Sequence, residues 1–215
     1  MKAISLWSGG KDSCLACYKA ISGGHDIAGL LNFMTSSQTN SLSHGLSAEV
    51  IGRQAGMTGI PSFQKAMPKE GYRDEFIKVI KEWKAAKGIE GIVFGDIYLE
   101  SHKKWIDDVC EELGITPIMP IWTTDTAGLM NEFIGLGFKA MIVVTRADKL
   151  GQEWLGREID KGLMKEFKDM GNIDPCGENG EFHTFVYDGP MFKKKVGFSN
   201  GKKTLHDGRW FLEVL

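Results

Sequence analysis

The first strand-like segment of the chain ends in two adjacent glycines, and this junction constrains the fold more than any other feature. Residues 3–7 form an apolar run, and the string SGGKDS follows at residues 8–13 before a helix-like stretch begins. A strand that ends in glycines and restarts as a helix directs several backbone N–H groups at one point, where the helix dipole adds positive charge. The junction therefore predicts an α/β fold with an anion-binding loop near its N-terminus.

The composition of this loop suits a nucleotide phosphate. The glycines lack a Cβ and let the backbone approach an anion, while the serine hydroxyls and the Lys11 ammonium are donors. Asp12 would lie in the first helical turn and hold a Mg²⁺ ion carried by the nucleotide. The loop has neither the Walker A spacing nor the G-x-G-x-x-G spacing. We expect all of its residues to bind the phosphates of a nucleotide cofactor: Ser8, Gly9, Gly10, Lys11, Asp12 and Ser13.

Bulk composition excludes several classes of protein. The chain has 215 residues, a formal net charge of −2 and a pI of about 6.2, so no global charge favours nucleic acid. Residues 1–2 are Met-Lys and a core strand follows, which predicts no signal peptide, and no apolar run is long enough to span a membrane. These features, with only four cysteines, predict a cytoplasmic protein with reduced thiols. Cys14 and Cys17 form a C-x-x-C pair, for which core packing is favoured over metal or redox chemistry.

Apolar runs of strand length alternate with amphipathic stretches over the first part of the chain. The expected strands are residues 3–7, 27–33, 60–67, 91–94 and 116–121; helices are expected after the loop, after Ser47, at 74–87 and at 105–113. This alternation predicts an α/β fold with a doubly wound, five-stranded parallel sheet. A polar loop is expected at residues 35–43.

Ligands of such sheets bind outside the carboxyl ends of the strands, near the point where the winding reverses. If the first and fourth strands are neighbours, Gly95 and Asp96 will face the 8–13 loop. Adenine is expected at the end of the second strand, from Asn32 to Met34. His44, in the polar loop, is a weaker candidate for contact with the nucleotide.

The pattern changes at about residue 123, so we expect an ATP-binding domain at residues 1–122 and a smaller α+β substrate-binding domain at residues 123–215. Helices are expected at 127–136 and 152–170, strands at 140–145, 180–186, 196–199 and 210–215, and turns at Asn200-Gly201 and Asp207-Gly208.

A second cluster of polar residues occupies positions 174–184 of this lobe. Strand alternation predicts that Glu181 and His183 point to one side, and Phe182 and Thr184 to the other. An acid and an imidazole on one face could bind a cation or move a proton. An ordinary surface hairpin would also account for these residues.

The loop SGGKDS, the string GDI at residues 95–97 and GENGEFHT at 177–184 together resemble the diphthine–ammonia ligase family of PP-loop ATP pyrophosphatases. Shorter likenesses at residues 120–122, 155–157 and 188–190 extend the resemblance over nearly the whole chain. It implies cleavage of ATP between the α and β phosphates and activation of a carboxylate as an adenylate. The implied reaction uses ammonium to convert diphthine, a modified histidine of translation elongation factor 2, to diphthamide.

The resemblance also implies roles for individual residues. The 8–13 loop would hold the triphosphate, and Gly95 and Asp96 would border the α-phosphate. The acceptor side of the cleft would be lined by Glu178, Glu181, His183 and Thr184. His183 or Glu181 could then accept a proton from ammonium.

Two other functions compete with this one: a PP-loop enzyme that thiolates tRNA, and a nucleotide sensor without catalysis. The first fits poorly with a pI near 6 and a single C-x-x-C pair. Free ammonium is the expected nitrogen donor because no glutaminase segment is visible. No membrane or nucleic-acid partner is expected. The sequence leaves open whether the protein forms a homo-oligomer.

Overall fold

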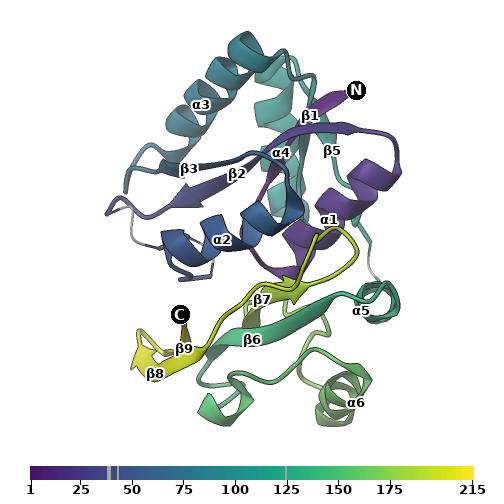
Figure 1. Ribbon diagram of the computed structural model, residues 1–215, viewed down its shortest axis with the longest axis vertical. Helices are drawn as coiled ribbons and strands as arrows, with labels where there is room; N and C mark the ends of the chain where they lie inside the picture. The colour runs from purple at the N-terminus through teal and green to yellow at the C-terminus, as the bar shows by residue number, and fades with distance from the viewer. Residues whose placement is uncertain (38–39, 43, 124) are drawn as a thin grey trace.

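Two lobes, each built on its own sheet, make up the protein in the computed structural model, which describes residues 1–37, 40–42, 44–123 and 125–215 (Figure 1). The first lobe alternates strands with helices: β1 (Lys2–Leu6), α1 (Lys11–Ser22), β2 (Asp26–Met34), α2 (Ala48–Thr58), β3 (Ser62–Ala66), α3 (Tyr72–Lys87), β4 (Gly91–Val93), α4 (Glu100–Leu113) and β5 (Thr116–Ile118).

The five strands of this lobe form one parallel sheet in the order β3-β2-β1-β4-β5. The winding reverses beside β1, because β2 lies on one side of it and β4 on the other. Buried residues of α3 and α4 form one apolar cluster with the sheet, whereas those of α1 and α2 belong to a second cluster. The predicted doubly wound α/β fold is therefore confirmed, and so is the pairing of the first strand with the fourth.

Local signals in the sequence determine where the helices begin and end. The Ser47 hydroxyl accepts a hydrogen bond from the Val50 N–H at 3.2 Å and caps α2, as its position predicts. Helices α3 and α4 end at Gly88 and Gly114, which both adopt the left-handed conformation. Of the expected polar loop at 35–43, residues 38, 39 and 43 lie outside the described part of the chain, and Ser41 pairs with Met34 at the end of β2.

The second lobe is a four-stranded antiparallel sheet in the order β7-β6-β9-β8 with helices beside it (Figure 1). Its elements are α5 (Thr126–Gly135), β6 (Lys139–Arg146), the 3-10 turn η1 (Gln152–Trp154), α6 (Lys161–Met170), β7 (Phe182–Asp188), β8 (Asn200–His206) and β9 (Arg209–Val214). The smaller α+β lobe that the sequence predicts is present, while the division at residue 122 stays a prediction.

Three details of this lobe differ from the sequence-based prediction. The helix expected at 152–170 is broken, because Gly156 has φ +86° and the residues after it pair with β6. In one of these backbone hydrogen bonds the Ile142 N–H donates to the Arg157 carbonyl. Residues 196–199 make isolated hydrogen bonds and no strand. Asn200-Gly201 is no turn, because both residues begin β8 opposite β9. Asp207-Gly208 is the predicted turn, with both residues at positive φ.

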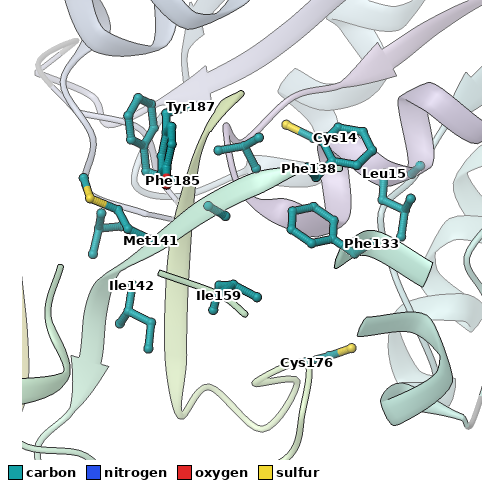
Figure 2. Packing of buried hydrophobic residues seen from close by; sticks show 14 of the residues in the cluster. Cys14, Leu15, Phe133, Phe138, Met141, Ile142, Ile159, Cys176, Phe185 and Tyr187 are labelled. Carbon is teal, nitrogen blue, oxygen red and sulfur yellow. The ribbon is translucent and has the colours of Figure 1, made fainter. Parts of the chain in front are cut away.

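The core of the second lobe is continuous with the layer of α1 and α2 (Figure 2). Tyr18 of α1 packs edge-on against Phe138 at 5.6 Å between ring centroids, and Phe138 stacks on Phe133 at 4.9 Å. Cys14 and Cys17 are buried free thiols in this core, so the C-x-x-C pair packs as expected. No helix in the described part of the chain is long and apolar enough to cross a membrane.

Candidate functional site

A cavity of about 350 Å³ lies where the carboxyl ends of β1, β2 and β4 meet the start of β7. Eleven of the residues singled out in the sequence line it: Ser8, Lys11, Asp12, Ser13, Asn32, His44, Gly95, Asp96, Glu178, His183 and Thr184. They come from both lobes, so the strands of the first lobe and the 174–184 segment of the second build one site. This is the crevice position that the winding of the sheet predicts.

The 8–13 loop is closed by its own hydroxyl groups. The Ser8 hydroxyl donates to the Ser13 hydroxyl at 3.1 Å, and the Ser13 hydroxyl lies 3.0 Å from the Gly10 carbonyl. Gly9 and Gly10 are buried behind the cavity wall. A Cβ on Gly10 would come within 2.1 Å of the His44 ring, so no larger residue fits beneath that imidazole.

Lys11 is buried and fully engaged. Its ammonium group donates to both carboxylate oxygens of Asp12, at 2.9 and 2.8 Å, and to the carbonyl of Cys176 in the second lobe. Burial lowers the pKa of Lys11, but Asp12, Cys176 and Glu178 together act in the opposite direction, and the pKa lies above its usual value. The residue therefore stays cationic in the cavity, where a polyphosphate would be attracted to it.

The end of β4 packs directly on the start of α1. A Cβ on Gly95 would lie 3.0 Å from the Ser13 nitrogen, so the strand end and the helix can approach this closely only because residue 95 is a glycine. Asp96 follows, and its carboxylate lies 3.0 Å from the His102 imidazole at the rim. The predicted placement of Gly95 and Asp96 opposite the 8–13 loop is thus confirmed.

Two imidazoles stack in the cavity, those of His44 and His183, with 4.9 Å between ring centroids. Burial and the nearby cations Arg209 and Lys11 lower the pKa of His183 to about 4. Burial, together with His183 and Lys11, also holds the pKa of His44 well below its usual value. Both rings are neutral at physiological pH, and His183 lies in a positive environment that repels cations.

Glu178 has the opposite environment. Burial and the neighbouring carboxylates of Asp12 and Asp96 raise its pKa to about 7, although Lys11 acts in the other direction. The backbone of Ile97 hydrogen-bonds this carboxylate and links it to the first lobe. At neutral pH, Glu178 can therefore gain or lose a proton inside the cavity.

The structure does not place Glu181 on the same side as His183, and that prediction is wrong. Glu181 precedes β7 and is buried beneath the 174–180 segment, where its carboxylate accepts from the Asp174 N–H at 3.2 Å and the Asn179 side chain at 3.3 Å. His183 and Thr184 both line the cavity. Strand alternation does not extend to Glu181, because β7 begins at Phe182 and Glu181 lies before it.

The expected adenine contacts are divided between the cavity and the core. The Asn32 amide lines the cavity and donates to the Trp7 carbonyl at 2.6 Å and the Ser41 hydroxyl at 3.2 Å. Its own oxygen is buried and has no hydrogen-bond partner among the residues that the structure describes. Met34 is buried further along β2, and its carbonyl accepts from the Met67 N–H. Asn32 is therefore the better placed of the two for contact with a base.

The sequence analysis missed Gln54, a fully buried residue of α2 behind the loop. Its amide nitrogen donates to the Gly9 carbonyl at 2.8 Å and the Val186 carbonyl at 2.6 Å, and its amide oxygen accepts from the Trp7 indole at 2.9 Å. The available signal was its position, because the spacing of Gln54 from Val50 and Ile51 places a polar side chain on the apolar face of α2.

Within the described ranges, no group of three or more His, Cys, Asp or Glu side chains has the arrangement to hold a metal ion. The negative charges of Asp12 and Asp96 nevertheless contribute to the raised pKa of Glu178. A cation that arrives with a substrate would relieve this repulsion.

Comparison with known proteins identifies both lobes. Residues 1–117 match the sequence profile of the diphthamide synthase N-terminal domain, and residues 125–214 match that of the diphthamide synthase C-terminal domain. Over its full length the chain is 26% identical to the diphthine–ammonia ligase of Danio rerio and to that of Homo sapiens, covering 92% and 89% of those proteins. It is 25% identical to the diphthine–ammonia ligase of Schizosaccharomyces pombe, where it covers 37% of a longer protein.

Proposed function

Because the chain belongs to the diphthamide synthase family, we propose that it is an ATP-dependent ligase that converts the carboxylate of protein-bound diphthine to an amide. The acceptor is translation elongation factor 2, the nitrogen donor is free ammonium, and the products are diphthamide, AMP and pyrophosphate. One observation carries the proposal: the 8–13 loop, with its cationic Lys11, and the acidic residue Glu178 line a single cavity. A site for this reaction needs both a polyphosphate end and an end that accepts a cation.

In the first half-reaction the 8–13 loop holds the triphosphate, and Lys11 offsets the charge that develops as pyrophosphate leaves. Mg²⁺ enters as part of the ATP substrate, and the carboxylates of Asp12 and Asp96 are oxygen ligands of the kind that it prefers. The diphthine carboxylate attacks the α-phosphorus, the bond to the bridging oxygen breaks, and an acyl-adenylate forms. Asn32, which lines the cavity, would contact the adenine.

In the second half-reaction ammonia displaces AMP. Ammonium must first lose a proton, and Glu178 is the best-placed acceptor because Asp12 and Asp96 surround it with negative charge. The ammonia nitrogen then attacks the acyl carbon. The C–O bond to AMP breaks, its electron pair stays on the phosphate oxygen, and the nitrogen loses a second proton as the amide forms. His183 and Thr184 line the acceptor side, whereas buried Glu181 supports the loop that carries Glu178.

The competing functions have less support. Burial raises the pKa of Cys17 and of Cys176 to about 12, so neither thiol is a ready nucleophile for sulfur transfer to RNA. The four free cysteines also fit a reducing compartment such as the cytoplasm.

The direct test mixes purified protein with ATP, ammonium and diphthine-bearing elongation factor 2. We expect AMP, pyrophosphate and the small mass decrease of an acid converted to an amide. Reactions without ammonium and with elongation factor that lacks diphthine are the controls. Binding of ATP with no AMP formed, in the presence of the modified acceptor, would identify the protein as a nucleotide sensor.

A further inference from the structure

The Gly9–Gly10 peptide is held from behind by a side chain that has no place in the reaction described above. Two donors converge on the Gly9 carbonyl: the Gln54 amide at 2.8 Å and the Val186 N–H of β7 at 3.0 Å. The Gln54 amide is itself fixed, since its nitrogen also bonds the Val186 carbonyl and its oxygen accepts from the Trp7 indole. Every polar atom of this buried side chain is therefore used.

A trans peptide bond transmits this restraint to the other side of the loop. The described chain has no cis peptide, so the carbonyl of Gly9 and the N–H of Gly10 point in opposite directions. With the carbonyl held against α2 and β7, the Gly10 N–H is directed toward Ser8, whose hydroxyl oxygen lies 3.3 Å away and lines the cavity. If the carbonyl were released, the peptide of two glycines could rotate and turn this donor away.

We propose that Gln54 is a positioning residue for the ATP polyphosphate: it fixes the Gly10 N–H, which in turn holds the Ser8 hydroxyl that lines the cavity. The inference rests on the proposed function, because it assumes that the 8–13 loop binds the phosphates beyond the α position. The proposed ATP site then includes a residue of α2, Gln54, which lies behind the 8–13 loop and does not contact the substrate. It also makes β7 of the second lobe part of the same restraint, through both main-chain groups of Val186.

The test compares ATP with AMP as calorimetric ligands. Gln54→Met keeps the approximate volume and removes both donors, and we expect ATP to bind about tenfold more weakly, since a lost buried hydrogen bond is of this order. AMP should bind as it does to the wild type. The matched control is Thr58→Val on the same helix, which removes the buried bond from its hydroxyl to the Ala55 carbonyl and leaves the loop alone. If Gln54 served stability alone, both variants would melt at a lower temperature, and each would keep the wild-type affinities for ATP and for AMP.

The outcomes separate the inference from the proposed function. If the wild type binds ATP no better than AMP, the loop does not hold the polyphosphate, and the proposed function is in error. If the wild type prefers ATP and folded Gln54→Met keeps the whole preference, the role of Gln54 is refuted. Should Gln54→Met fail to fold, Trp7→Phe removes the indole N–H that orients the Gln54 amide and makes the ring smaller, and AMP binding reports the effect of the smaller ring alone. A several-fold loss of the preference for ATP over AMP is then expected, and full preference would refute the inference.

Discussion

The main-chain N–H of Lys11 donates to the hydroxyl of Thr184 at 3.0 Å, across 173 positions of sequence. Gly10 occupies the N-cap position of α1 and has no side chain to cap the helix. Thr184, on β7, therefore supplies from the second lobe an acceptor for one of the N–H groups that the first turn of the helix leaves unpaired. The first turn of the nucleotide-binding helix depends on a residue of the other lobe.

Replacement of Thr184 by valine tests this capping bond. The two side chains have nearly the same shape, so Thr184→Val should lower the free energy of unfolding by about 1 kcal/mol through the lost hydrogen bond alone. Thr184→Ser keeps the hydroxyl and should recover most of the loss. Urea denaturation of the three proteins gives the comparison, and equal stability of the valine and serine variants would exclude the cap.

Lys11 and Asp12 should be essential for turnover. Lys11→Ala removes the buried cation that balances the phosphates, and Asp12→Ala removes its carboxylate partner, so AMP formation should fall by at least about 100-fold in each variant. The matched control is Lys19→Ala on the same helix, where the lysine forms an exposed ion pair with Glu132. Full activity of either loop variant would show that the phosphates bind elsewhere.

The rate should depend on pH through Glu178. A proton acceptor must be ionised, so kcat/KM for ammonium should rise as the pH passes through about 7, the pKa of this carboxyl. Glu178→Gln should remove this rise and slow amide formation, while ATP–pyrophosphate exchange in the presence of the diphthine protein continues. An unchanged pH profile in Glu178→Gln would assign the proton to another group.

Stability should change with pH in a corresponding way. The folded-state pKa of Glu178 is raised above its usual 4.5, so the folded protein binds the extra proton and loses stability as the pH rises from about 4.5 to about 7. Above this range Glu178→Gln should be more stable than the wild type by roughly 1 kcal/mol, because the residue is only half-buried and solvent screens part of the effect. Below about pH 4.5 the two proteins should unfold alike, and thermal melts at both extremes measure the difference.

Asp96→Asn tests the carboxylate at the end of β4. We expect at least about tenfold slower ATP–pyrophosphate exchange, because the amide keeps the shape of the side chain but loses the charge available to Mg²⁺. His102→Ala removes the partner of Asp96 at the rim, 3.0 Å away, and should have a smaller effect. Wild-type exchange by Asp96→Asn would remove this residue from the site.

Much of the fold was predictable because its signals are local. Apolar runs, the Ser47 cap and the glycines after α3 and α4 define the elements, and parallel strands place Gly95 beside the 8–13 loop. The errors occur where pairing with a distant strand overrides the local signal. Asn200-Gly201 has a turn composition and pairs with β9 instead.

The candidate site divides in the same way. The 8–13 loop is recognisable because all of its chemistry lies within six consecutive residues. The Thr184 cap and the Gln54 amide act across 173 and 45 positions, respectively, and no local pattern encodes such contacts. Strand alternation misplaced Glu181 because this residue lies before the start of β7 at Phe182, where its carboxylate accepts from the Asp174 N–H instead.

We expect that the two lobes cannot be exchanged independently between members of the family. Strand β7 provides hydrogen-bond partners for Gly9 and Lys11 and an acceptor for Gln54. The conformation of the 8–13 loop therefore depends partly on residues 184–186. A chimera that joins the first lobe of this chain to a foreign second lobe should fold yet bind ATP poorly unless that short segment is carried along. Engineering of acceptor specificity should accordingly leave these three residues in place and vary the loop that precedes them.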